Sequence, residues 1–252
     1  MKTFTLITLI CFPALLFAQN KPADLLGKCA ISSLQQSPYA SWYDPNFADY
    51  KPDEELVQQL RRADLKGIRL KIVFGSWCGD SKRELPRMVK LVKQMAWDER
   101  NMELIGVDDS TEVYKQSPQH EEAGLEVYRV PTFIVYSNNN EIGRIVEFPV
   151  ASLERDLLQI VSQKVYTPNY FSYPYIIQWM KDGLLADENV SPRGLAMQIY
   201  GKVQYESELN ACGYVLMARD QLTEAIKVFR INANLFPQSS NCFDSLGEAY
   251  AK

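Results

Sequence analysis

Apolar residues follow two different periodicities in the middle of the chain. Four short apolar runs, rich in β-branched residues, have the length of strands and lie at 68–74, 102–108, 131–137 and 142–148. Residues 80–100 and 152–164 instead place apolar side chains every three or four positions, which is typical of amphipathic helices. The three asparagines at 138–140, between the last two runs, predict a hairpin turn.

The order of these elements predicts the fold class. A polar segment at 111–124 is interpreted as a further helix, so that strands and helices alternate before the hairpin. This order predicts an α/β domain over residues 67–164, with a mixed sheet and helices on both faces. A short amphipathic helix that ends before Gly67 is expected to precede the domain.

The segments that flank this domain differ from it in composition. Residues 19–66 begin with an aromatic, turn-rich stretch, which we interpret as an irregular extension whose rings pack on the domain. Residues 165–191 are also aromatic and are interpreted as a loop-like connector. From 192 to 252 the pattern is helical, so a small all-α segment is expected to follow the α/β domain.

The first residues have the pattern of a secretory signal. Lys2 precedes an apolar run that ends at Ala18, so residues 1–18 are interpreted as a signal peptide and the protein as exported, most simply to a periplasm. Two alternatives are a retained membrane anchor and a lipoprotein attached at Cys11. After removal of the signal, no span of a membrane is expected. Four cysteines then remain, and they allow three disulfide pairings: Cys29, Cys78, Cys212 and Cys242.

Composition excludes several classes of function. A chain of 252 residues that is 46% hydrophobic can bury a core, and its net charge of -4 without a basic block argues against a nucleic-acid partner. Because there is a single histidine, His120, neither a metal site nor a Ser-His-Asp site is expected. We expect no cofactor.

Candidate chemistry is concentrated in the sequence Gly-Ser-Trp-Cys-Gly-Asp-Ser at 75–81. Cys78 comes directly after a predicted strand and starts a predicted helix, where unpaired N–H groups and the helix dipole favour a thiolate. Lys82 and Arg83 add positive charge, whereas Asp80 opposes it. Ser81, one helical turn later, is expected to donate a hydrogen bond to the sulfur.

This segment and two others resemble the thioredoxin family. A strand runs into Trp77-Cys78, Pro86 lies eight residues after the cysteine, and Val130-Pro131-Thr132 opens the hairpin as the family's cis-proline loop does. The resemblance covers about residues 67–163 and implies a thioredoxin-like fold that exchanges thiols and disulfides with proteins through Cys78. It also implies that the substrate docks on the turn and the loop, at Trp77, Gly79, Asp80, Val130 and Pro131.

The chain departs from the family at three positions. Ile72 and Leu104 stand where thioredoxins carry a buried acid and its lysine, and Ser81 replaces the second cysteine of the motif. Release of a mixed disulfide then needs an external thiol or another cysteine, for which Cys29 is the candidate. Two functions remain open: exchange through mixed disulfides, and a redox-silent adaptor that binds proteins.

Residues 209–237 resemble one tetratricopeptide repeat. Gly213, Ala225, Phe229 and Pro237 occupy that motif's characteristic positions, and Gly247 follows Gly213 by 34 residues, so a second, incomplete copy is expected. These helices are either a cap packed on the α/β domain or a docking surface for a partner protein. Cys212 and Cys242 either form a disulfide with each other or are ordinary small residues of the core.

Overall fold

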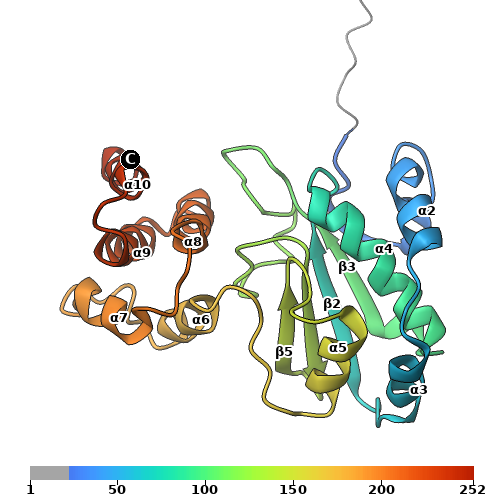
Figure 1. Cartoon of the computed structure of the whole chain (residues 1–252). Helices are drawn as coiled ribbons and strands as arrows, with labels where there is room; N and C mark the ends of the chain where they lie inside the picture. Colours follow the sequence, from blue (N-terminus) through green and yellow to red (C-terminus); the bar gives the residue numbers. More distant parts are fainter. Residues whose placement is uncertain (1–22) are drawn as a thin grey trace, which may run out of the picture.

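The computed structural model describes residues 23–252 and has an α/β part followed by a helical part (Figure 1). The expected signal peptide at 1–18 lies outside the described residues. The strands are β1 (Gly27–Cys29), β2 (Ile68–Phe74), β3 (Met102–Gly106), β4 (Thr132–Ser137) and β5 (Asn140–Val146). The helices of the α/β part are α1 (Ile31–Leu34), α2 (Ala40–Asp49), α3 (Glu54–Arg62), α4 (Gly79–Gln94), a 3-10 turn (Glu99–Asn101) and α5 (Leu153–Val161). The helical part comprises α6 (Tyr173–Lys181), α7 (Pro192–Ile199), α8 (Ser207–Ala218), α9 (Leu222–Leu235) and α10 (Ser240–Ala251).

The five strands form one mixed sheet in the order β1-β3-β2-β4-β5. The central strand β2 runs parallel to β3 and antiparallel to β4, and β1 and β5 are antiparallel edge strands. The predicted hairpin is confirmed between β4 and β5. Its turn residues Asn138 and Asn139 have φ angles of 49° and 69°, a left-handed pair that suits a two-residue turn and that asparagine tolerates well.

One face of the sheet is covered by helices α2, α3, α4 and α5 (Figure 1). We call it the helix-covered face. Alternate residues of β2, among them Ile72 and Phe74, point into this core and meet fully buried residues of α4 such as Leu85 and Met88. Burial of this apolar surface is the main source of stability for the part, at about 25 cal/mol per Å².

The opposite face is covered differently from the prediction. No helix forms over 111–124; this segment makes successive turns, with Lys115 and His120 in the left-handed region at φ 55°. Buried residues of the loop at 107–130, such as Val107 and Val127, pack on Val73 of β2. Beyond this loop-covered face lies the helical part, rather than a helix of the domain itself.

Two aromatic segments are more regular than the sequence indicated. The stretch interpreted as an irregular extension forms helix α2, although its rings pack on the core as expected, with Tyr43 buried. The segment at 165–191, expected to be a loop-like connector, forms α6 from Tyr173 onward. Tyr173 and Trp179 are buried in the core of the helical part, so α6 belongs to that part.

Helices α8 and α9 form a close antiparallel pair in the helical part. A Cβ on Gly213 of α8 would lie 2.3 Å from Cζ of Phe229 on α9, so only glycine permits this approach. Asn232 Nδ2 of α9 donates to Asn210 Oδ1 at 2.8 Å, a hydrogen bond between buried side chains of the same two helices. The close approach expected from the repeat pattern is confirmed.

Candidate functional site

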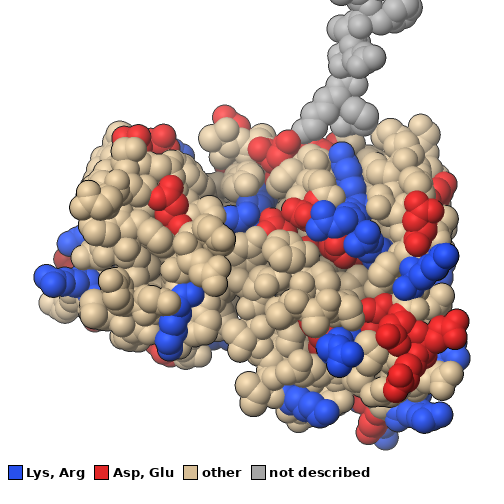
Figure 2. Space-filling view, in the orientation of Figure 1, with Lys and Arg blue, Asp and Glu red and all other residues tan. Residues whose placement is uncertain are grey.

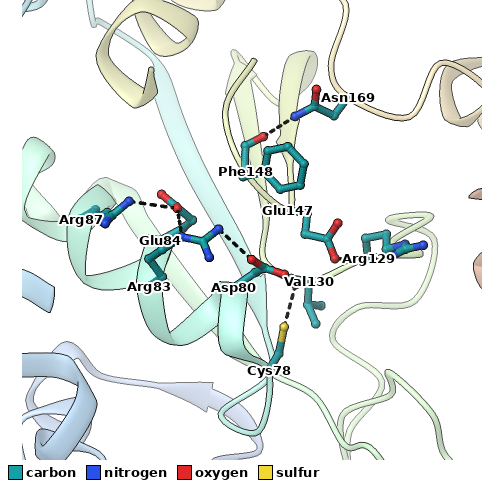
Figure 3. Close-up of polar contacts among 10 residues, drawn as sticks. All are labelled: Cys78, Asp80, Arg83, Glu84, Arg87, Arg129, Val130, Glu147, Phe148 and Asn169. Atoms are coloured by element: carbon teal, nitrogen blue, oxygen red, sulfur yellow. Dashed lines mark hydrogen bonds and ion pairs between the residues drawn. The ribbon is translucent and has the colours of Figure 1, made fainter. Parts of the chain in front are cut away.

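Cys78 lies at the N-terminus of α4, on the loop-covered face. It is the N-cap residue, with an extended backbone at φ -78° and ψ 128°, and its half-buried thiol donates to the carbonyl of Val130 at 3.1 Å (Figure 3). The tight turn before it needs Gly75, since a Cβ there would lie 2.5 Å from the Trp77 ring. The thiol therefore faces both the first N–H groups of a helix and the loop that carries Val130 and Pro131.

The residues expected to surround the sulfur are brought together. The Val130–Pro131 peptide bond is cis, and Trp77 is anchored by Nε1, which donates to the carbonyl of Val107 at 2.9 Å. Gly79 is exposed, with no atom near the place a Cβ would take. Asp80 forms an ion pair with Arg83 at 2.7 Å. Turn, loop and helix start thus make one surface around Cys78.

Ser81 does not have the expected role at the sulfur. Its side chain is fully buried, and its Oγ accepts the N–H of Gly75 at 3.2 Å. Among residues 23–252 the structure shows no hydrogen bond between Ser81 and Cys78. Ser81 instead ties the first turn of α4 to the end of β2, which fixes the position of the cysteine.

Two arginines of α4 pair with neighbouring acids. Arg83 pairs with Asp80 and also donates to Glu84 at 2.6 Å, and Arg87 reaches the same carboxylate at 3.2 Å (Figure 3). Glu84 is almost completely buried, so this network is a structural element of the helix. The expected contribution of Arg83 to thiolate stabilisation is thus reduced by its acidic partners.

Cys78 opens into a cleft of ≈ 360 Å³ between the α/β part and helix α8. Figure 2 shows a notch between the two parts, with basic side chains at its base. The α/β wall of this cleft contains Trp77, Cys78, Tyr114, Lys115, Arg129, Val130 and Glu147, and the α8 wall contains Ser207, Asn210, Ala211 and Tyr214. All charged groups of the lining lie on the α/β wall.

Three charged residues of the α/β wall were not identified from the sequence. Lys115 is 4% exposed, and burial, assisted by the positive charge of Arg129, lowers the pKa of its ammonium to about 7. Burial raises the pKa of Glu147 above its usual range. No motif marked these residues, because they come from separate segments that meet only in the folded chain.

Arg129 connects the α/β wall to the helical part. Its guanidinium lies 3.4 Å from Glu147 Oε1, donates to the carbonyl of Ser207 at 2.9 Å, and stacks over the Tyr170 ring at 4.9 Å. A second contact between the parts runs from Gln116 Nε2 to the carbonyl of Ala218 at 2.7 Å. The α8 wall is therefore held over Cys78 by hydrogen bonds to the loop-covered face.

Cys29 is not placed to resolve a mixed disulfide at Cys78. It lies on edge strand β1 beside Leu104 of β3, and its side chain packs in the core of the helix-covered face, whereas Cys78 packs on the opposite face. Burial raises the pKa of the Cys29 thiol to about 12. A thiol so far from ionisation is a poor nucleophile.

Cys212 and Cys242 are both buried free thiols, so the disulfide alternative is not observed. Burial raises the pKa of Cys212 well above its ordinary value. Cys242 has a different environment, with its thiol 3.6 Å from Glu206 Oε2, and burial raises its pKa to about 11. They are small core residues of the helical part.

Residues 23–252 contain no group of histidine, cysteine and acidic side chains arranged to hold a metal ion. Within the same range, no helix combines the length and the apolar character required to cross a membrane.

Comparisons with known proteins give little further information. No protein-family model matches the chain, and no curated protein is detectably similar to it. One solved structure can be aligned with the chain, a crystal structure of a protein of unknown function from Pseudomonas aeruginosa. The alignment covers 57% of this chain and 82% of the Pseudomonas chain, at 18% sequence identity and a TM-score of 0.31. A TM-score this low carries no argument about fold or function.

Proposed function

We propose that this chain is an exported thiol–disulfide exchange protein with a thioredoxin-like α/β domain, in which Cys78 is the single nucleophile. The observation that carries the proposal is the position of the sulfur. It lies at a helix N-terminus, 3.1 Å from the Val130 carbonyl, and lines a cleft of ≈ 360 Å³. The sulfur therefore lies where the first N–H groups of a helix are unpaired and where a substrate can reach it.

In the proposed reaction the Cys78 thiolate attacks one sulfur of a substrate disulfide. A new S–S bond joins Cys78 to the substrate, the substrate's own S–S bond breaks, and its second sulfur leaves as a thiolate that takes up a proton. Trp77, Gly79, Asp80, Val130 and Pro131 form the surface on which an extended protein substrate docks.

The mixed disulfide is expected to persist. Ser81 supplies no second thiol, and Cys29 is partly buried against the core on the opposite face of the sheet. Release then requires an external thiol, so the site is suited to capture rather than to rapid turnover. The tetratricopeptide-like pair α8–α9 acts in this proposal as a cap that supplies the second wall of the cleft.

Trapping tests the proposal directly. The reduced protein is mixed with a disulfide-bonded peptide, and intact masses are measured without reductant. Wild type and Cys29→Ala should form a covalent adduct that a small thiol reverses, whereas Cys78→Ala should form none. Absence of an adduct in the wild type would contradict exchange and leave the redox-silent adaptor that binds proteins.

A second cysteine at position 81 provides a complementary test. Positions 78 and 81 are three residues apart at a helix start, so their side chains are neighbours. Ser81→Cys should therefore release captured peptide as a reduced product and leave a disulfide in the protein. Export is tested separately, by locating the protein after cell fractionation and determining its mature N-terminus.

A further inference from the structure

A buried lysine shares the cleft with Cys78. Lys115 is held by its own turn: its N–H donates to the carbonyl of Asp108 at 2.9 Å, and its backbone has φ 55°. Its side chain is 4% exposed and lines the cleft together with the sulfur. Lysine is rarely buried unless paired with an acid, because removing an ammonium from water is costly. The hydrogen bond shown for this ammonium goes to a neutral group instead, the Tyr114 hydroxyl at 2.7 Å.

The surroundings of Lys115 bring the pKa of its ammonium close to neutral pH. Burial is the main cause that lowers its pKa to about 7, and the positive charge of Arg129 acts in the same direction. Groups that become anionic oppose this effect, in the order Cys78, Glu147 and Cys212. Ammonium and amine are therefore both populated near pH 7, as a group that accepts and returns a proton requires.

We propose that Lys115 is the proton carrier of the Cys78 site: in the shared cleft its amine accepts the thiol proton of Cys78, and the resulting ammonium gives that proton to the departing substrate sulfur. This inference rests on the proposed exchange function. The proton balance closes, because one S–H is lost at Cys78 and one is formed on the leaving thiol. Electrons also balance, because one S–S bond forms as another breaks.

The two positions where the resemblance would place a proton relay offer no alternative carrier. Ile72 and Leu104, which replace an acid and a lysine in the resemblance described above, are buried apolar residues of the helix-covered face. The α8 wall contributes neutral side chains to the cleft. On the α/β wall, Arg129 keeps its proton and Glu147 is paired with it at 3.4 Å. Lys115 is thus the lining residue whose protonation can change readily.

The test compares two neutral disulfides whose leaving thiols differ in basicity. Dipyridyl disulfide releases a weakly basic sulfur that needs no proton, whereas hydroxyethyl disulfide releases a basic alkyl thiolate that does. Single-turnover formation of the mixed disulfide is measured at pH 7 for wild type, Lys115→Met and Lys115→Arg. Both substitutions should slow the alkyl reaction by about 10²-fold, typical of lost acid–base catalysis, and slow the dipyridyl reaction less, because there only the deprotonation of Cys78 is lost. Arginine retains the charge but holds its proton.

A matched control is available in the helical part. Lys227 of α9 is also buried, at 5% exposure, and its Nζ donates to the carbonyls of Asp187 and Val190 at 2.6 and 2.8 Å, remote from the cleft. Lys227→Met should leave the ratio of the two rates unchanged.

Three other outcomes would overturn parts of the scheme. Equal slowing of both disulfides by Lys115→Met and Lys115→Arg would show that Lys115 does not give a proton to the departing sulfur. An arginine variant as fast as wild type would show that charge, not proton transfer, is what the site uses. If wild type forms no mixed disulfide with either reagent, the exchange function itself fails, and the inference with it.

Discussion

The two walls of the cleft are built in opposite ways. The α/β wall carries the sulfur and every charged group of the lining, whereas the α8 wall offers Ser207, Asn210, Ala211 and Tyr214, which are neutral. The α/β wall owes its chemistry to turns and helix ends, where backbone groups are unpaired and side chains can be buried without regular packing. The α8 wall is one face of a tightly packed helix pair. One wall therefore carries the thiol and the charges, and the other contributes only neutral side chains.

The largest expected contrast between the walls is in thiol reactivity. Cys78 on the α/β side is half-buried and faces the cleft, whereas Cys212 of α8 is fully buried and its pKa is raised by burial. Timed alkylation with iodoacetamide should label Cys78 alone in the native protein. Cys29, whose pKa is about 12, should react roughly a thousandfold more slowly than an ordinary thiol because its thiolate is so scarce.

Peptide mass spectrometry after the alkylation gives the site and rate of each modification. Labelling in denaturant, where Cys29, Cys78, Cys212 and Cys242 should all react, is the control. Equal native rates at Cys78 and Cys212 would remove the contrast between the walls.

The buried charge on the α/β wall should make stability depend on pH. The folded-state pKa of Lys115 is lowered to about 7 from 10.5, so between these values the unfolded chain binds more protons than the folded chain. The free energy of unfolding of wild type should therefore rise with pH in this range, by up to about 1.4 kcal/mol per unit from this group. Below pH 7 this group no longer makes stability depend on pH, because the folded and unfolded chains both bind its proton.

Urea unfolding from pH 6 to pH 10 measures this effect. In Lys115→Met the free energy of unfolding should no longer rise with pH, and at pH 6 this variant should be more stable than wild type. In Lys115→Arg the rise should also be absent, and this variant should be less stable than Lys115→Met at every pH. Parallel curves for wild type and Lys115→Met would show that the lysine does not titrate in this range.

Sequence periodicity was sufficient for most regular elements of the α/β part. Strands β2 and β3, helices α3 and α5, and the asparagine turn follow from alternation, three- to four-residue spacing and turn residues. Periodicity did not predict the structure of segments in which apolar and polar side chains follow no regular spacing. Helix α2 carries Pro45 and aromatic rings all round, and the polar segment at 111–124 forms successive turns, in which Tyr114 and Lys115 line the cleft.

The candidate site divides in the same way. Trp77 and Cys78 are neighbours in sequence, and Val130 and Pro131 were found through a motif, so the surface around the sulfur could be predicted. Lys115 and Arg129 come from the loop at 107–130 and Glu147 from the end of β5, and their burial depends partly on helix α8. A single sequence does not reveal that burial. Ser81 shows the converse: its position was predicted, but its hydrogen bond goes to Gly75 instead of the sulfur.

The α8 wall should be sensitive to one added methyl group behind it. A Cβ on Gly213 would lie 2.3 Å from the fully buried Phe229 ring, so Gly213→Ala forces the helices apart and should cost about 1–3 kcal/mol of stability. Gly247→Ala is the matched control. No atom lies within 4 Å of its Cβ position in α10, so the change should be neutral or stabilise by up to about 1 kcal/mol. Equal melting temperatures for the two variants would contradict the close packing of α8 on α9.

The smallest expected effect concerns the surface of α8 that lines the cleft. Ala211 is half-buried and lines the cleft opposite Cys78, so Ala211→Leu narrows the entrance without adding charge. Capture of a disulfide-bonded protein should slow about fivefold, or about 1 kcal/mol, while alkylation by iodoacetamide, a small molecule, is unchanged. Ala251→Leu makes the same substitution at an exposed position of α10 and should alter neither rate. Equal slowing of both reactions by Ala211→Leu would mean that the leucine distorts the sulfur site. No slowing of either would mean that substrates reach Cys78 without passing α8, and the division of labour between the walls would then be wrong.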